Sequence, residues 1–157
     1  MRYFLSILVT LAWALWFGGL ILLFLVVTQL SHTFPAPRRA VFGEAGSATF
    51  MMFERYQLIV GAVALVTAFG LRLLSGPSAV RTTLFCLLAL AAVGALLSPM
   101  VITPKIDALR KSGQTDTQEF KKLHGQSMMV YSGDALILLV AGTLLPAAMK
   151  NRRSSEV

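Results

Sequence analysis

Four apolar segments dominate the chain, and each is long enough to cross a lipid bilayer. They cover approximately residues 3–30, 51–74, 82–103 and 127–149. A helix needs ~20 residues to span a hydrocarbon core of about 30 Å. Lipid offers no partner to unpaired backbone groups, so each span is expected to be helical. The sequence therefore predicts an all-α fold, an integral membrane bundle of four transmembrane helices with short helical loop extensions on one side.

Composition and charge agree with a membrane protein. Of 157 residues, 56% are hydrophobic and 13% are charged, whereas soluble domains carry about 25% charged residues. The length suits a single domain over residues 1–157. The first apolar run is too long for a signal peptide, so we expect an uncleaved span. The net charge of +7 comes from basic residues at the span ends, which indicates contacts with anionic lipid head groups and no nucleic-acid partner.

The segments between the spans differ on the two sides of the membrane. Side A carries both termini and the short turn 74–82, whereas side B carries two loops of about twenty residues, 31–50 and 105–125. The first loop opens with Pro35 and Pro37, and its second half is expected to be a short helix. Pro104 is expected to close the third span.

The second side B loop is predicted to hold two amphipathic helical pieces. They are expected to break at Ser112-Gly113, because glycine favours turns. Thr115 or Asp116 is expected to cap the second piece, with Glu119 in its first turns. That piece can run directly into the fourth span.

Polar side chains inside the spans gather near side B. At 100° per residue, His124, Ser127, Tyr131 and Asp134 fall within an arc of roughly 80° on one helix. Ten residues separate the first from the last, so Asp134 lies about 15 Å deeper than His124. A carboxylate inside a membrane normally faces the bundle interior and finds a partner.

Other span ends on side B supply candidate partners. The second span opens with Glu54, Arg55 and Gln57, and the first leaves the membrane through Gln29 and His32. We expect Arg55 to pair with Asp134, since the planar guanidinium suits a carboxylate. Tyr131 is expected to donate to the same carboxylate, and Glu54 to meet His124 or Gln29. The candidate binding cluster is His124, Ser127, Tyr131, Asp134, Glu54, Arg55, Gln57, Gln29 and His32.

The polar stripe has a structural and a functional interpretation. Interhelical hydrogen bonds can simply join helices, at roughly 0.6 to 2 kcal/mol each. The stripe can equally bind a solute, a proton or an ion. A copper or haem site using His32 and His124 is the competing hypothesis, although no spacing is diagnostic of a metal. We expect His124 to lie at the membrane surface in a structural or ligand-orienting role.

No motif in the sequence indicates a reaction. The chain shows no nucleophilic triad, phosphate-cradling glycine loop or dinucleotide motif, so no catalytic residue, metal ligand or cofactor is assigned and an enzyme is not expected. Trp13 and Trp16 are expected to be packing residues. Small residues recur at spacing four, at Ser6, Thr10, Ala14 and Gly18, a pattern that lets helices approach closely. Packing within one bundle, in a homo-oligomer or against a membrane protein partner stays open.

Several short motifs together resemble a known family. They are Trp16-Phe17-Gly18-Gly19, Phe53 with Tyr56, Pro104 with Leu109, and Phe120 with His124-Gly125 and Ser127. In this order they are similar to the transmembrane protein 205-like family, also called domain of unknown function 4149. The resemblance implies a four-helix integral membrane protein, sometimes associated with drug resistance, with no agreed biochemical activity. The chain has Tyr131 and Glu54 where the family has asparagine and proline. A fainter likeness is to copper-resistance membrane proteins, which also carry tryptophan and two glycines early in a span.

These observations predict a small membrane protein with a resistance, transport-accessory or partner-binding role centred on the side B cluster. The expected location is a bacterial inner membrane. Side A carries six basic residues in about twenty positions, and side B eight in about twice that length. Because the density of Lys and Arg near span ends is higher on side A, both termini are predicted to be cytoplasmic.

Overall fold

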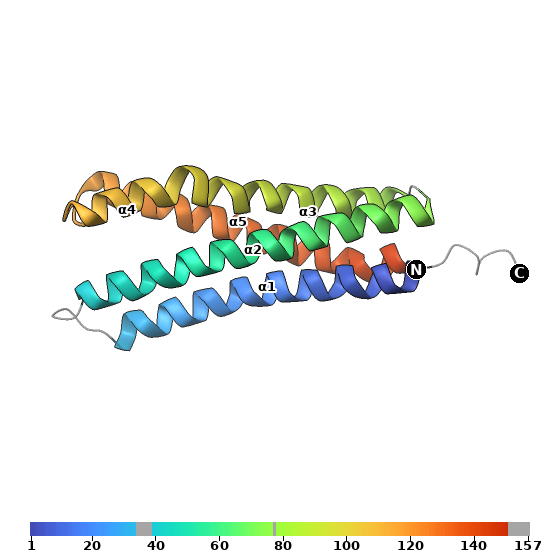
Figure 1. The fold of residues 1–157 in the computed structure, drawn as a ribbon, viewed down its shortest axis with the longest axis horizontal. Helices are drawn as coiled ribbons and strands as arrows, with labels where there is room; N and C mark the ends of the chain where they lie inside the picture. Colours follow the sequence, from blue (N-terminus) through green and yellow to red (C-terminus); the bar gives the residue numbers. More distant parts are fainter. Residues whose placement is uncertain (34–38, 77, 151–157) are drawn as a thin grey trace, which may run out of the picture.

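The computed structural model describes residues 1–33, 39–76 and 78–150, and these residues are helical apart from short connections (Figure 1). Within this part of the chain no strand occurs. The elements are α1 (Arg2–Thr33), α2 (Arg39–Ser75), α3 (Ala79–Leu97), the π-helical segment η2 (Ser98–Ile102), α4 (Thr103–Lys111) and α5 (Gln118–Met149).

Four stretches are long and apolar enough to cross a membrane. They are residues 2–30, 43–75, 79–111 and 118–149, the third being built from α3, η2 and α4 together. The start of α1 and the end of α5 lie at the same end of the bundle, which is side A (Figure 1). The predicted all-α bundle of four membrane-spanning helices is confirmed.

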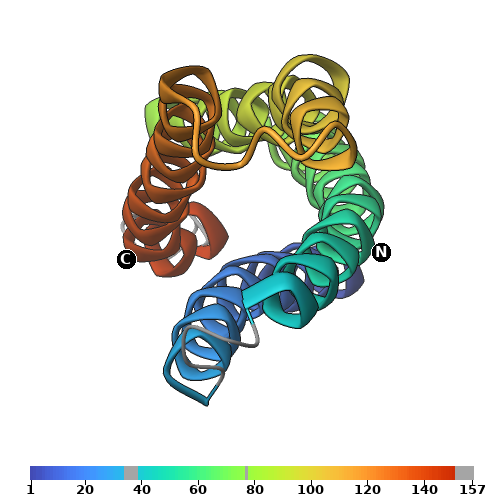
Figure 2. The ribbon, with the colours of Figure 1, turned by 90° about the vertical axis from the view of Figure 1, so that its left-hand side faces the viewer.

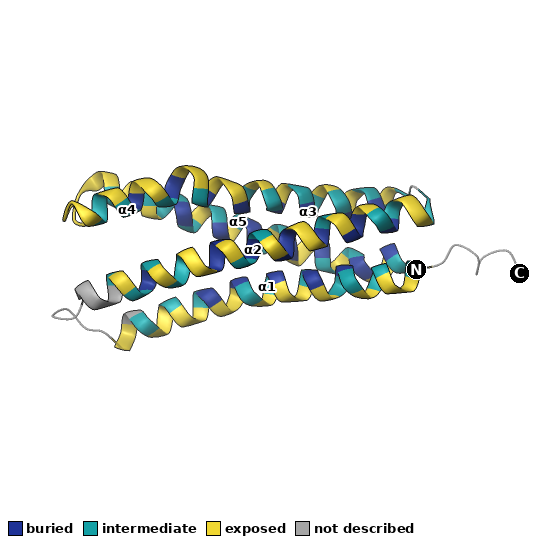
Figure 3. Ribbon diagram, in the orientation of Figure 1, coloured by how far each residue is buried: buried dark blue, intermediate teal, exposed yellow. Residues whose placement is uncertain are grey.

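The main hydrophobic core lies between the helices in the half nearer side A and in the middle of the bundle. Trp16, Ala64, Leu88 and Leu138 are all completely buried there. Exposed leucine, valine and phenylalanine side chains cover the outer faces, which are yellow in Figure 3. Lipid is as apolar as leucine, so an apolar outer face is the expected surface of a membrane bundle.

Glycines let the helices approach closely around the two tryptophans. A Cβ added to Gly61 would lie 2.9 Å from the Trp16 ring, and one added to Gly142 would overlap the Trp13 ring. The Trp13 Nε1 donates to the Leu138 carbonyl at 2.6 Å, which joins α1 to α5. The predicted packing role of both tryptophans is therefore confirmed.

Towards side B the pair formed by α1 and α2 diverges from α4 and α5 (Figure 1). Figure 2, which views this end, shows the same separation between α1 and α5. A smaller core of Leu20, Leu23, Phe53 and Tyr131 remains at this end. The splayed arrangement leaves polar side chains and cavities between the helices at side B.

The prediction that Pro104 closes the third span was wrong. The helix passes through η2 and continues as α4 to Lys111, with Pro99 and Pro104 in the first turns of η2 and α4. A proline cannot donate the N–H that a continuing helix needs, so Pro99 leaves the Ala95 carbonyl free to accept from Gln57 Nε2 at 3.4 Å. The span therefore extends on side B as a helix.

The loop predictions for side B hold in part. The break at Ser112-Gly113 is confirmed, and Gly113 adopts φ 72°, which glycine reaches without strain. Thr117, and neither Thr115 nor Asp116, caps α5 by accepting from the Phe120 N–H at 3.3 Å.

The amphipathic extension on side B continues into the fourth span without interruption, as predicted. Glu119 lies in the first turn of α5. In the first side B loop, the second half is helical, as predicted, and the helix that starts at Arg39 is continuous with the second span. Pro35 and Pro37 lie outside the described residues.

Candidate functional site

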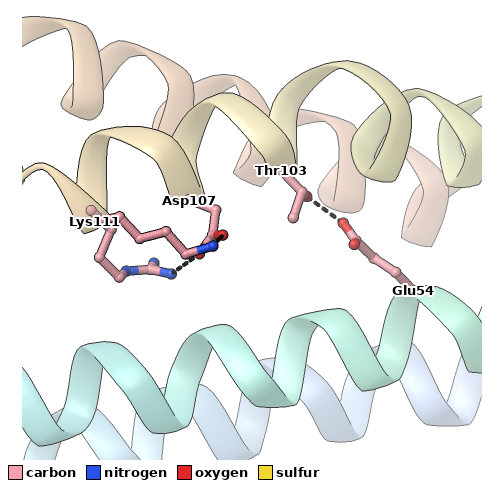
Figure 4. A network of polar contacts seen from close by, with 5 residues as sticks. Glu54, Thr103, Asp107 and Lys111 are labelled. Carbon is pink, nitrogen blue, oxygen red and sulfur yellow. Dashed lines mark hydrogen bonds and ion pairs between the residues drawn. The ribbon is translucent and has the colours of Figure 1, made fainter.

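Glu54 is the centre of a buried polar cluster on side B. Its side chain is only 4% exposed and lies on the inner face of α2. Oε1 accepts hydrogen bonds from Thr103 Oγ1 at 2.5 Å, Ser98 Oγ at 3.0 Å and Tyr131 Oη at 3.1 Å. The three donors come from α4, η2 and α5, so one carboxylate oxygen connects three segments to α2. Figure 4 shows the bond to Thr103.

The π-helical segment η2 explains how two hydroxyl groups of the third span, those of Ser98 and Thr103, both reach Glu54 Oε1. Ser98 and Thr103 are five residues apart, which in a regular α-helix would turn them about 140° away from each other. In η2 the Thr103 backbone N–H bonds to the Ser98 carbonyl, five residues back. The wider turn brings both hydroxyls to the Glu54 side, with their oxygens 3.3 Å apart. Such π-turns occur frequently at functional sites.

A second polar layer lies one helical turn deeper. Gln57 is completely buried and its Nε2 donates to the Ala95 carbonyl at 3.4 Å, while its Oε1 has no hydrogen-bond partner in the part of the chain that the structure describes. Asp134 is 3% exposed and its Oδ2 has no hydrogen-bond partner among the described residues. The carboxylate packs against Gly94, where an added Cβ would overlap it. Glycine at 94 is therefore what makes room for the aspartate on the facing helix.

A cavity adjoins this cluster on side B. It has a volume of about 330 Å³. Thr103 lines the cavity and also bonds Glu54, so it connects the cavity to the buried carboxylate. The lining residues are Val27, Thr28, Gly43, Gly46, Ser47, Phe50, Thr103, Ile106, Arg110, His124 and Ser127.

The cavity is apolar in its body and basic at its rim. Arg110 and the His124 ring are its ionisable lining groups, and none of the described lining residues is acidic. Asp107 lies 3.9 Å from Arg110 but only 2.8 Å from Lys111, so Lys111 holds the closer ion pair (Figure 4). The cavity can accept a ligand with an apolar body and a negative group.

The predicted stripe on the fourth span is partly buried and partly at the surface. Ser127, Tyr131 and Asp134 are buried inside the bundle, as the spacing indicated. His124 is exposed, stacks on Phe120 at 6.3 Å between ring centroids, and lines the cavity beside Ser127. The stripe therefore leads from a water-accessible histidine to a buried carboxylate.

The predicted partners within the cluster were wrong. Arg55 is exposed, and no ion pair joins it to Asp134 within the described residues. Tyr131 donates to Glu54 and not to Asp134. Glu54 bonds hydroxyls of η2, α4 and α5 and neither His124 nor Gln29. Residues 54 and 55 point about 100° apart on a helix, so the inward position of Glu54 turns Arg55 out to the exposed surface.

The remaining candidate residues lie at the surface of side B. Gln29 and His32 are exposed near the end of α1. Over the described residues no group of three or more His, Cys, Asp or Glu side chains lies close enough to hold a metal ion. No observation in the structure therefore favours the copper or haem alternative.

Sequence reasoning did not assign Ser98, Thr103 or Arg81 to their sites. Arg81 is 7% exposed at side A, where Nε donates to the Ala148 carbonyl at 2.9 Å and Nη1 to the Ser75 carbonyl at 2.9 Å. A buried arginine beside a helix end is a recognisable signal, because helix C-termini leave carbonyls without partners.

Fold and site together define a four-helix integral membrane protein with a buried polar cluster open towards one face. A family model, the domain of unknown function DUF4149, matches residues 11–115 of the chain. This match covers more than half of the chain, and the protein belongs to the DUF4149 family. Comparisons with curated proteins and with solved structures find no match.

Proposed function

We propose that the protein binds a small amphipathic molecule with a negative group in the side B cavity, without catalysing a reaction. The observation that supports this most is the cavity of about 330 Å³, with its apolar body and with Arg110 and His124 at its edge. Small-molecule sites typically have volumes of about 300 to 1,000 Å³ and carry few polar groups. The role is that of a resistance or transport-accessory protein.

The resemblance to transmembrane protein 205-like proteins supports the same direction. It implies a link to drug resistance, which a protein that sequesters amphipathic compounds in the membrane could provide. We propose further that the location is a bacterial inner membrane, with anionic lipid head groups as neighbours. A second copy of the chain or another membrane protein is proposed as partner, because residues such as Ala14 and Gly18 leave small, exposed positions on α1.

The binding proposal is tested by equilibrium binding of radiolabelled decyl phosphate to the protein in nanodiscs of zwitterionic lipid. Decyltrimethylammonium, with the same chain and the opposite charge, is the competitor of choice. We expect saturable binding of decyl phosphate that the cation does not displace. Arg110→Gln should weaken binding, because charged groups hold anions through charge-assisted hydrogen bonds.

A matched pair of glycine variants provides the control. Gly46 lines the cavity and an added Cβ there meets no atom within 4 Å, so the side chain of Gly46→Leu would occupy the cavity. A Cβ added to Gly18 likewise meets no atom within 4 Å, but Gly18 lies on the exposed face of α1 and does not line the cavity. Gly46→Leu should abolish binding and Gly18→Leu should leave it unchanged. Equal binding in both variants, or displacement by the cation, would overturn the proposal.

Orientation has its own experiment. We propose that side A, with both termini, faces the cytoplasm, which the density of basic residues at its span ends supports. An alkaline phosphatase fused after Val157 should then be inactive, and a fluorescent protein at the same place should fluoresce. Phosphatase activity outside the membrane would contradict this orientation.

A further inference from the structure

Three helices each carry two polar groups one turn apart, and the groups form two layers. On α2 these are Glu54 and Gln57, and on α5 Tyr131 and Asp134. On the third span they are Ser98 and the Ala95 carbonyl that Gln57 contacts. Three residues of helix rise correspond to about 4.5 Å. The Glu54 layer and the Asp134 layer therefore lie one helical turn apart.

The two acidic side chains have opposite surroundings. Glu54 receives three hydroxyl donors on one oxygen and also lines a second cavity, which lies next to Arg55 and Asp107 near side B. Asp134 is buried deeper, and its Oδ2 has no donor in the described part of the chain. A buried carboxylate without a donor or counter-ion is neutralised by taking up a proton or a cation.

The neighbours of Asp134 supply no positive charge. Within α1 no ionisable residue occurs between Tyr3 and His32, and η2 contains none. The only ionisable residue of α3 besides Arg81, which bonds carbonyls at side A, is the exposed Cys86.

On α2 the nearest ionisable group that faces inward is Glu54, since Arg55 is exposed. On α5 itself it is Tyr131, which donates to Glu54. The charged groups of α4 begin beyond Thr103, at Lys105. A proton is thus the simplest ligand that the surroundings of Asp134 allow.

The two layers are closed towards side A. Below the Asp134 layer, Ala91, Leu88 and Leu138 are completely buried between α3 and α5, and a cavity of about 180 Å³ that borders Gln57 has otherwise apolar lining residues. Towards side B, Glu54 and Thr103 both border cavities. Proton exchange with water can therefore occur from side B and not through the apolar core.

We propose that Glu54 and Asp134 form a proton-binding pair that exchanges with water on side B alone. Glu54 accepts a proton from water. Tyr131 Oη, which donates to Glu54 in the structure, takes over this proton, turns its own O–H towards Asp134 one helical turn deeper on α5, and releases that proton to it. The proton comes to rest on Asp134 Oδ2, and Glu54 returns to the carboxylate. One proton has then moved from side B to Asp134, with no other change. This proposal goes beyond ligand binding in the cavity and does not depend on it.

Infrared spectroscopy of the protein in nanodiscs tests the proposal. A protonated carboxyl group in an apolar site gives a C=O stretching band separate from that of carboxylates, and this band shifts in D₂O. We expect such a band at neutral pH in the wild type, its loss in Asp134→Asn, and its persistence in Glu44→Gln, which removes an exposed acid of side B. Absence of the band, or a band that Asp134→Asn leaves unchanged, would overturn the proposal.

The role of Glu54 is read from the rate of exchange. Deuterium should reach the Asp134 carboxyl more slowly in Glu54→Gln than in the wild type, while Glu44→Gln should exchange at the wild-type rate. An unchanged rate in Glu54→Gln would remove Glu54 from the path. Asp134→Glu serves as the folding control, because it keeps a carboxyl group and should keep a shifted band.

Discussion

Removing the Tyr131 hydroxyl should destabilise the bundle mainly through its hydrogen bond to Glu54. The Tyr131 ring is 1% exposed and packs on Phe50 and Phe53 at 5.6 and 6.2 Å between centroids. Tyr131→Phe retains this packing and deletes the donor to Glu54 Oε1 at 3.1 Å, together with an acceptor for Ser98 Oγ at 3.2 Å. Ser98 Oγ also donates to Glu54, so the bond to the Glu54 carboxylate is the main loss.

The magnitude follows from the acceptor. Hydrogen bonds between membrane helices average about 0.6 kcal/mol and reach about 1.7 kcal/mol, whereas bonds to charged groups contribute about 1.5–3 kcal/mol. Ser98 and Thr103 still donate to the same Glu54 oxygen in the variant. We therefore expect a loss near about 1.5 kcal/mol, the lower end of the range for charged acceptors.

A double-mutant cycle assigns this loss to Glu54. The free energy of unfolding is measured by SDS titration in mixed micelles for wild type, Tyr131→Phe, Glu54→Leu and the double variant. With Glu54 absent, Tyr131→Phe should cost only about 0.6 kcal/mol, for the remaining bond with Ser98, which gives a coupling of about 0.9 kcal/mol. Tyr56→Phe is the matched control, because Tyr56 Oη donates to the neutral Leu15 carbonyl at 2.9 Å and its loss should cost about 0.6 kcal/mol. The reasoning is refuted if Tyr131→Phe costs no more than Tyr56→Phe and does so with or without Glu54.

Two further predictions concern packing and the side A end, and SDS titration measures both. Gly142→Ala should lower the free energy of unfolding by about 1–3 kcal/mol, because the added Cβ would overlap the Trp13 ring. Gly133→Ala, with open space around its Cβ, should be neutral or slightly stabilising. Equal effects of the two variants would contradict the close approach of α1 and α5. Arg81→Met should lower the free energy of unfolding by about 1.5–3 kcal/mol, because it leaves helix-end carbonyls without a donor. Arg72→Met, at a partly exposed position, should change it by no more than about 0.5 kcal/mol. Similar losses in both variants would show that Arg81 acts only as surface charge.

The spans and the concentration of polar groups near side B could be predicted from the sequence. Length and hydropathy define membrane helices, since lipid tolerates little else. The buried face of α5 could also be predicted, because a carboxylate such as Asp134 must turn away from lipid. These inferences each concern one helix and its environment.

The partners within the cluster could not be predicted, because they depend on how each helix is rotated against its neighbours. Hydrophobicity does not distinguish the inner from the outer face of α2, since lipid and core are equally apolar. The choice between Glu54 and Arg55 as the inward residue was therefore undetermined. Small residues supply the missing signal: Gly61, Ala64 and Ala68 follow Gln57 down the face of α2 that contacts Trp16 and the core.

The π-turn of η2 was equally beyond the sequence. Pro99 and Pro104 predict that the helical hydrogen bonding is interrupted. A helix that ends at this point is consistent with that prediction, and so is a helix that continues through a wider turn. The continued helix is what brings Ser98 and Thr103 to Glu54. The centre of the site thus depends on a local irregularity that the residue pattern allows without specifying.

The central claim, that the polar interior opens to side B and is closed to side A, is tested most directly by cysteine accessibility. Single cysteines replace Ser127, which lines the side B cavity, and Thr67, a 5% exposed residue nearer side A, in a Cys86→Ala background. A membrane-impermeant thiol reagent should label Ser127→Cys from side B only, and decyl phosphate should slow this labelling. Thr67→Cys should stay unlabelled from both sides. Labelling of Thr67→Cys from side A, or no labelling of Ser127→Cys from side B, would contradict the account.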